Sequence, residues 1–386
     1  MQRVTSTDFS IKLDTITSQS GTDFDTRMTL RALELAARGI GQVSPNPLVG
    51  CVIVSENGDV VGEGTYLYDS VTHAEVVALA QAGDRAKGGT AYVSLEPHSH
   101  HGKTAPCTEA LISAGIKRVV APIEDPNPHV SGKGFERLRA EGIEVLTGVL
   151  ANEATRQNEK FICWHEHGRP FVHLKMAMSL DGRISLGRSL STALSGEAAL
   201  KRVHEMRHEH DAILVGANTV VVDDPSLTDR SGRDRRRKLV RVILDNRLRT
   251  PVDSQIVVTA KDIPTVIVSN STDIDKRKEI SSRGVDFVVE DARSLRAVLS
   301  ALRQRDIQSV LVEGGTEVAG AFRDAGLIDK LSLMISPRII GGSDAPFAFG
   351  GRGAMSIEEA APLKDVSIER HGEDIEITGY PSQLQI

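Results

Sequence analysis

Segments with the apolar spacing of a helix alternate with short apolar runs of strand length along the first part of the chain. Residues 28–38 repeat apolar positions every three or four residues and are followed by Gly39, which predicts a helix that ends at this glycine. Residues 49–54 form an apolar run of strand length, and Asn57-Gly58 predicts a tight turn into a returning strand at 60–61. We then expect, in order, a helix at 74–82, a strand at 91–95, a helix after Cys107, and strands at 118–121 and 143–146. Such alternation is typical of a sheet with crossover helices.

A polar segment with glycine and proline, residues 152–170, separates this part from a second α/β pattern. Beyond it we expect a turn at Asp181-Gly182, helices at 197–208 and 317–324, and strands at 171–176, 212–215, 240–244, 265–268, 287–289, 310–312 and 331–335. The patterns together predict four parts: a flexible tail at 1–24, a first domain at 25–150, a linker at 151–169 and a second domain at 170–386.

Composition and charge narrow the class of protein. The 386 residues include 46 Lys and Arg against 52 Asp and Glu, a net charge of -6, so the chain lacks the positive excess that non-specific nucleic-acid binding requires. No apolar run reaches the roughly 20 residues of a membrane span. The polar N-terminus lacks the apolar core of a secretory signal, and three distant cysteines do not suggest a disulfide framework. We therefore expect a cytoplasmic protein with neither a nucleic-acid nor a membrane partner.

Two segments of the first domain suggest a metal site. His73-Ala74-Glu75 begins a predicted helix, and residues 95–107, which include His98 and end at Cys107, run from a strand into the next helix. A catalytic zinc takes three protein ligands and one water, and a His-x-Glu pattern places a ligand beside a carboxylate that can carry protons. Cys107 at a helix N-terminus is expected to favour the thiolate that zinc needs. A lone His-Ala-Glu or a buried cysteine is common without a metal, but the two segments together predict a zinc site with Glu75 as proton carrier.

These segments, with Ser44-Pro45-Asn46-Pro47 before the first strand, resemble the deaminase domain of the bifunctional riboflavin-biosynthesis deaminase/reductase family. The resemblance implies a three-layer fold like that of cytidine deaminase, a bound Zn2+, and a small phosphoribosylaminopyrimidine as substrate. It also makes Asn46 a candidate for a hydrogen bond to the substrate, the alternative being a plain turn residue between two prolines.

One position departs from the family pattern. The zinc ligands implied by the resemblance are His73, the residue at 98 and Cys107, and the family has Cys where this chain has His98. Imidazole is an ordinary zinc ligand, so His98 is predicted to complete the site and to make it more positive by one charge. His100 or His101 could replace it as ligand, and a deaminase domain without activity is the alternative.

The second domain has no Gly-x-Gly-x-x-Gly motif, so a Rossmann domain has no direct support. Three segments instead follow predicted strands: 175–183, 216–228 and 312–316. Gly314-Gly315 before a helix offers free backbone N–H groups and a positive helix end to a phosphate. The three segments resemble the reductase half of the same family, whose fold is similar to dihydrofolate reductase. The resemblance implies that NADPH reduces a ribosylamino group to a ribitylamino group.

The resemblance also assigns roles to individual positions of the reductase half. Lys175 and Glu313 are the candidates for proton and charge handling, and Glu313 also faces the substrate. Further substrate contacts are expected from Ser191, Arg207, Leu227 and Arg230. Cofactor contacts are expected from Met178, Ala193, Ser195, Thr219, Asp223, Gly315, Thr316, Glu317, Val318 and Ala319. The basic stretch 230–238 is interpreted as a solvated loop, with a contact to the 2'-phosphate of the cofactor as the alternative.

The resemblance extends from about residue 25 to about residue 380. It predicts a bifunctional, homo-oligomeric enzyme that uses Zn2+ and NADPH. Two alternatives remain at this stage: a reductase with an inactive deaminase domain, and a deaminase acting on nucleic acid. The net negative charge, the single Trp and the four Tyr argue against the second, because single-strand binding relies on basic grooves and aromatic stacking.

Overall fold

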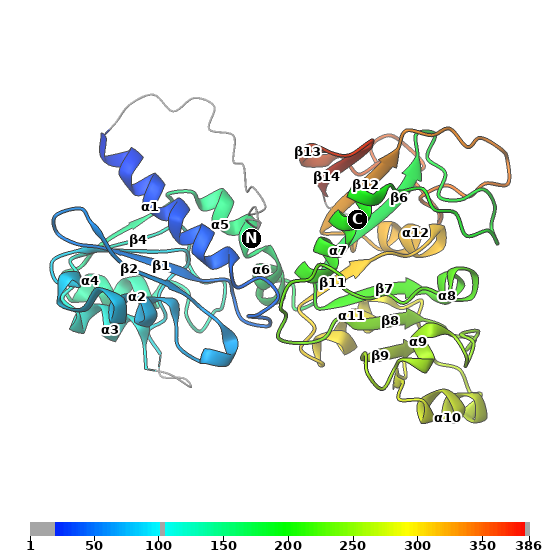
Figure 1. Ribbon diagram of the computed structural model, residues 1–386, viewed down its shortest axis with the longest axis horizontal. Helices are drawn as coiled ribbons and strands as arrows, with labels where there is room; N and C mark the ends of the chain where they lie inside the picture. The colour runs from blue at the N-terminus through cyan, green and yellow to red at the C-terminus, as the bar shows by residue number, and fades with distance from the viewer. Residues whose placement is uncertain (1–19, 101–104, 383–386) are drawn as a thin grey trace, which may run out of the picture.

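The computed structural model describes residues 20–100 and 105–382, which form two β-sheets, each flanked by helices (Figure 1). The first sheet has five strands in the order β2-β1-β3-β4-β5, of which β1 is antiparallel to its two neighbours and the rest are parallel. Its strands are β1 (Gly50–Val54), β2 (Val60–Thr65), β3 (Thr90–Val93), β4 (Arg118–Ala121) and β5 (Glu144–Thr147). The helices are α1 (Ser20–Ala37), α2 (Ala74–Ala82), α3 (Cys107–Ser113) and α4 (Lys133–Ala140). We refer to this part as the deaminase-like domain.

Both faces of the first sheet are covered, which gives three layers. In β1, Val52 packs with Ala32 and Leu35 of α1. Cys51 alternates with it and packs on the opposite face, in a cluster that includes Ala78 of α2. The apolar run at 49–54 therefore reflects a strand that is buried on both sides.

Helix α1 begins at Ser20, earlier than the sequence pattern indicated, so residues 20–24 are helical although we expected them in the flexible tail. The reason is a set of tertiary contacts around Asp25. Its carboxylate accepts hydrogen bonds from Arg118 at 2.7 and 2.8 Å and from the Tyr92 hydroxyl at 2.8 Å. The ring of Phe24 also lies edge-on to Tyr92. Residues 1–19 lie outside the described residues.

The second sheet has nine strands in the order β10-β9-β8-β7-β11-β6-β12-β14-β13. All neighbours are parallel except the pairs β12–β14 and β14–β13. The strands are β6 (Phe171–Ser179), β7 (Ala212–Gly216), β8 (Val240–Leu244), β9 (Thr265–Val268), β10 (Asp286–Val288), β11 (Ser309–Val312), β12 (Lys330–Ser336), β13 (Leu363–His371) and β14 (Asp374–Pro381). The helices are α7 (Glu197–Glu209), α8 (Ala217–Asp223), α9 (Gln255–Val258), α10 (Ile274–Ser282), α11 (Leu295–Arg303) and α12 (Thr316–Asp324). This part is the reductase-like domain.

Two apolar clusters bury the two faces of the second sheet. One joins alternate residues of β6, β7 and β11 to α11 and α12, and the other joins β7, β8 and β9 to α8, α9 and α10. The register pairs Val312 of β11 with Leu174 of β6 and with Leu214 of β7. The carboxyl ends of β7 and β11 therefore lie side by side, next to the middle of β6, at the edge where ligands of open α/β sheets bind.

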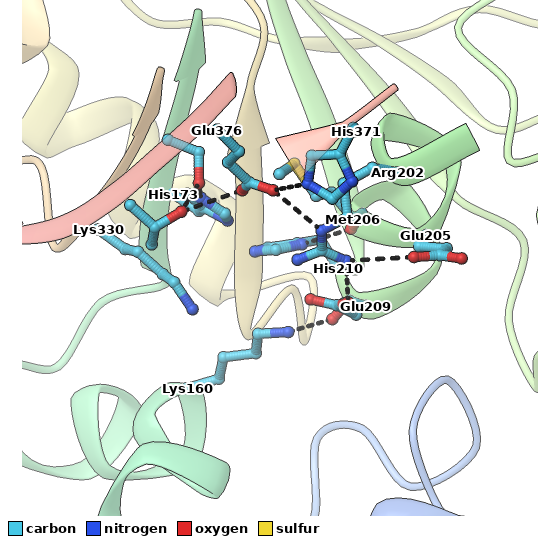
Figure 2. A network of polar contacts seen from close by, with 12 residues as sticks. Lys160, His173, Arg202, Glu205, Met206, Glu209, His210, Lys330, His371 and Glu376 are labelled. Carbon is cyan, nitrogen blue, oxygen red and sulfur yellow. Dashed lines mark hydrogen bonds and ion pairs between the residues drawn. The ribbon is translucent and has the colours of Figure 1, made fainter. Parts of the chain in front are cut away.

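The segment expected to be a linker contains two helices, α5 (Ala151–Gln157) and α6 (Glu159–Glu166). Gln157 donates a hydrogen bond to the Leu33 carbonyl of α1. In α6, Lys160 donates to the main-chain oxygen of Glu209, and Arg202 joins the Glu209 and Glu376 carboxylates in the same network (Figure 2). Helix α5 also reaches the second domain, because Arg156 pairs with Asp365 of β13 and lies over the ring of Tyr380. No helix within residues 20–100 and 105–382 is both long and apolar enough to cross a bilayer.

Candidate functional site

Three side chains that lie far apart in the chain meet at one edge of the first sheet. His73 precedes α2, His98 lies in the loop after β3, and Cys107 is the first residue of α3. One ligand atom from each lies within 4.8 Å of the others, and the two imidazole rings are 4.5 Å apart between centroids. Two imidazoles and a cysteine sulfur are ordinary zinc ligands. The structure therefore brings together the three residues that the sequence selected, with His98 at the position of the family cysteine.

The neighbouring histidines are placed differently. His100 is exposed, and its ring stacks edge-on against His98 at 5.2 Å instead of joining the group of potential ligands formed by described residues. His101 lies outside the described residues.

Glu75 lies in the first turn of α2 and is 2% exposed. It is hydrogen-bonded to Cys107, whereas its Oε2 has no partner within the part of the chain that the structure describes. A buried carboxylate oxygen without a protein partner is rare and calls for a water, ion or ligand. Together with the three potential ligands, this oxygen fits a site where a metal and its water bind.

Without a bound metal, the helix N-terminus does not outweigh the burial of Cys107. Burial raises the pKa of the Cys107 thiol well above its ordinary value, and the Glu75 carboxylate adds to this effect. A bound cation would reverse the balance, because metals deprotonate the thiols that coordinate them.

Asn46 is linked to the potential metal ligand His73 through Tyr66. Its amide nitrogen donates to the Tyr66 hydroxyl at 2.6 Å, and the Tyr66 ring lies 5.3 Å from the His73 ring. The Asn46 N–H also donates to the Val43 carbonyl, as expected of a turn residue, and its hydrogen bond to a substrate stays a prediction. Tyr66 thus lines this site. The sequence did not reveal it, because nothing in the residues around Tyr66 distinguishes it from other aromatic residues at strand ends.

Glu96 is a second residue that the sequence analysis missed. Its buried carboxylate accepts hydrogen bonds from the N–H groups of Asp125, Gly132 and Gly134 at 2.8–3.0 Å. These bonds fix the strand end that leads, two residues later, to His98. The signal in the sequence was a carboxylate beside a proline at a strand end, where an unpaired charge would be costly to bury.

The reductase-like domain has a buried group of three charges at the ends of its central strands. Arg207 of α7 donates to both carboxylate oxygens of Glu313, at 2.7 and 3.0 Å, and also to the Thr228 carbonyl. Lys175 of β6 is 8% exposed and interacts electrostatically with Glu313. Arg207 was expected to contact the substrate, which stays a prediction; in the structure its guanidinium is bonded to Glu313.

Burial and charge act in opposite directions on this group. Burial by itself would raise the pKa of Glu313, but the charges of Arg207 and Lys175 hold it below its ordinary value of 4.5. Burial lowers the pKa of Lys175, although the Glu313 carboxylate opposes this shift. The site thus keeps an ionised carboxylate beside an amine that gives up its proton more readily than usual.

The other predicted positions lie around the same strand ends or on the loops that follow them. Met178 is near the end of β6, Thr219 and Asp223 lie in α8 after β7, and Gly315–Ala319 leads into and begins α12 after β11. Ser191 and Ala193 are exposed, and Ser195 is half-buried, in the segment between β6 and α7. Leu227 is buried, with a φ of 48°. Arg230 is exposed and donates to Ser226 and Thr228.

The two glycines after β11 differ in how much space surrounds them. A Cβ on Gly314 would lie 2.5 Å from Val318, whereas a Cβ on Gly315 would meet open space. The first glycine lets the loop approach α12, and the second leaves room at the helix N-terminus.

The interpretation of residues 230–238 as a solvated loop is wrong for Arg235, Arg236 and Arg237, which are half-buried. Arg235 donates to Asp229 and to the carbonyls of Arg207 and His210. Only tertiary contacts reveal these partners, because the sequence around them is uniformly polar.

Comparison with known proteins gives matches to both domains. The zinc-binding region of cytidine and deoxycytidylate deaminases matches residues 22–122, and the RibD C-terminal domain matches residues 170–377. The chain is 42% identical over 352 residues to riboflavin biosynthesis protein RibD of Bacillus amyloliquefaciens, covering 91% of this chain and 94% of the relative. It is 41% identical over 349 residues to the RibD protein of Actinobacillus pleuropneumoniae, covering 89% and 92%.

Solved structures agree over both domains. RibD of Acinetobacter baumannii superposes with a TM-score of 0.85 at 35% identity, covering 94% of this chain and all of that one. A diaminohydroxyphosphoribosylaminopyrimidine deaminase/5-amino-6-(5-phosphoribosylamino)uracil reductase of Thermotoga maritima gives 0.83 at 36% identity, covering 94% and 100%. These matches confirm the predicted α/β fold, with a cytidine-deaminase-like domain followed by a reductase domain. The chain therefore belongs to the RibD family of riboflavin-biosynthesis enzymes, which join a zinc-binding deaminase domain to a reductase domain.

Proposed function

We propose that the chain catalyses two consecutive steps of riboflavin biosynthesis on one small-molecule substrate. The first is the zinc-dependent hydrolytic deamination of 2,5-diamino-6-(5-phosphoribosylamino)pyrimidin-4-one. The second is the NADPH-dependent reduction of its ribosyl side chain to a ribityl chain. The name of the Thermotoga maritima relative, at 36% identity over the whole of that chain, supports this pair of reactions. The single observation that carries the first step is the grouping of His73, His98 and Cys107 beside the buried Glu75.

In the deamination, His73, His98 and Cys107 would hold the zinc, which when bound activates water toward the ring carbon that carries the amine. The Glu75 carboxylate takes one proton from that water and passes it to the ring nitrogen. It then carries the second proton, from the hydroxyl that has added to the ring carbon, to the amine, which leaves as ammonia while the carbonyl forms. Its burial suits this role, because bulk water does not compete for the proton. Asn46, fixed by Tyr66, offers the substrate a hydrogen bond at the edge of the metal site.

In the reduction, bound NADPH supplies a hydride to the first carbon of the opened sugar. Lys175, with its lowered pKa, delivers the accompanying proton, and Glu313 orients the sugar hydroxyls as an ionised acceptor. Arg207 keeps Glu313 in place through two hydrogen bonds. The N–H groups before α12 would face a cofactor phosphate.

Metal analysis combined with ammonia release tests the proposed function. We expect close to one zinc per chain in the wild type, and loss of both zinc and ammonia release in His98→Ala. NADPH oxidation with the deaminated substrate should persist in that variant, since the reductase site lies in the other domain. His129→Ala, an exposed histidine of the same domain, is the matched control and should behave like the wild type. Wild-type protein that contains no zinc and releases no ammonia would refute the deaminase half of the proposal.

A further inference from the structure

The basic stretch of the reductase-like domain reaches the deaminase-like domain. Arg236 lies over the ring of Tyr68, with its guanidinium carbon 3.7 Å from the ring centroid. Its Nη2 donates to the Ser44 carbonyl at 2.6 Å, and its backbone N–H donates to the Gly41 carbonyl at 2.9 Å. One arginine of the second domain thus contacts two separate segments of the first, one on each side of β1 and β2 in the sequence.

Two further residues of the reductase-like domain hold the same loop. Arg237 donates to the Ser44 hydroxyl at 3.0 Å, and Gln308 donates to the Pro45 carbonyl at 2.6 Å. Gln308 is 5% exposed, so its bond is shielded from water. The backbone oxygens of Gly41, Ser44 and Pro45 are therefore all bound by side-chain or main-chain donors of the other domain.

The loop fixed in this way carries the candidate substrate contact of the deaminase site. Asn46 follows Pro45 directly, and its amide donates to the Tyr66 hydroxyl, whose ring lies against the metal ligand His73. Tyr68, under the Arg236 guanidinium, is two residues from Tyr66. Arg236 consequently contacts Ser44 and Tyr68, each two residues from a member of the Asn46–Tyr66 pair.

We propose that Arg236 is a positioning residue for deamination, acting from the reductase-like domain to hold Asn46 and Tyr66 in the geometry that binds the pyrimidine. The inference rests on the proposed deamination at this site. A guanidinium suits the role because its plane stacks on an aromatic ring while its edge donates hydrogen bonds. Because the Arg236 guanidinium binds Ser44 and Tyr68 at the domain interface, nothing supports the alternative that this residue contacts the 2'-phosphate of the cofactor.

The test uses the full-length protein and the two activities as separate readouts. In Arg236→Ala we expect the KM for ammonia release to rise about tenfold while kcat changes less than about twofold, because binding geometry is lost and the zinc group is not. Zinc content and NADPH oxidation with the deaminated substrate should equal those of the wild type. Arg236→Lys keeps the positive charge but loses the planar guanidinium, so its KM should lie between those of the wild type and Arg236→Ala.

Two other variants keep the result interpretable. Lys238→Ala is the matched control, since this exposed residue of the same stretch donates to Asp262 within its own domain. Gln308→Ala removes the neighbouring bond to Pro45 and should raise the same KM by a smaller factor.

An unchanged KM in Arg236→Ala overturns the proposal. So does a parallel loss of both activities or of zinc, because that pattern indicates a purely structural role. Wild-type protein without ammonia release overturns the proposed function, and this inference with it; that result is recognised in the wild type before any variant is compared.

Discussion

Replacing Glu313 by Gln removes a buried anion from between two cations while it preserves the shape of the side chain. The Glu313 side chain is 12% exposed and is bonded twice by Arg207. At an effective dielectric constant of about 20, two unit charges about 4 Å apart attract by about 4 kcal/mol. Removing one partner of a buried ion pair costs about 3–5 kcal/mol. Because the amide retains one acceptor oxygen, we expect the free energy of unfolding of the reductase-like domain to fall by about 3 kcal/mol.

The single tryptophan makes this change measurable. Trp164 of α6 lies against the Arg303 guanidinium of α11, 4.2 Å from ring centroid to guanidinium carbon, so its fluorescence reports unfolding of the reductase-like domain. With a urea slope of about 2 kcal/mol per molar, the unfolding midpoint should fall by about 1.5 M. Glu279→Gln, an exposed glutamate of α10, is the control and should shift the midpoint by less than about 0.3 M. A Glu313→Gln midpoint within that same margin of the wild type at neutral pH would refute the argument.

The pH dependence of this difference follows from the sign of the pKa shift. The pKa of Glu313 in the folded protein lies below its ordinary value of 4.5, because the neighbouring cations outweigh the effect of burial. Its stabilising contribution is therefore complete above about pH 4.5 and is lost as the pH falls through the lower, folded-state pKa. The gap between wild type and Glu313→Gln should narrow in acid. A gap that widened on acidification would contradict this assignment.

Two further predictions concern the stability of each domain. Asp25→Asn should weaken the deaminase-like domain by about 2 kcal/mol, seen as faster hydrogen exchange in its sheet at neutral pH. The Arg118 hydrogen bonds lower the pKa of Asp25, so this loss should shrink below about pH 4, and equal exchange at pH 7 would contradict it. Gly320→Ala would place a Cβ 2.3 Å from the Gly350 carbonyl carbon. We expect it to lower the free energy of unfolding by about 3 kcal/mol, measured as a lower urea midpoint of Trp164 fluorescence. Gly315→Ala, whose Cβ would meet open space, should leave that midpoint unchanged.

Much of the fold follows from local patterns in the sequence. Strand β8 and helix α2 have the predicted bounds, and β1, β6, β7 and β11 differ from them by a few residues at their ends. These strands are buried on both faces, so they read as unbroken apolar runs. Helix α6 and strand β13 were missed for the opposite reason. The first is set by polar contacts such as Lys160 with Glu209, and the second is exposed along most of its length.

The sequence by itself determined the candidate residues for the chemistry, because motifs such as His73-Ala74-Glu75 and Glu313-Gly314-Gly315 fix residue types at strand ends and helix starts. Tertiary structure alone decided which of them meet. It placed His98 within reach of His73 and Cys107, paired Arg207 with a glutamate 106 residues away, and brought Arg236 to Ser44 across 192 residues. The physical reason is that a periodic pattern records only which side of an element is buried. The partner across a buried contact, and hence the sign of each pKa shift, depends on how distant elements pack.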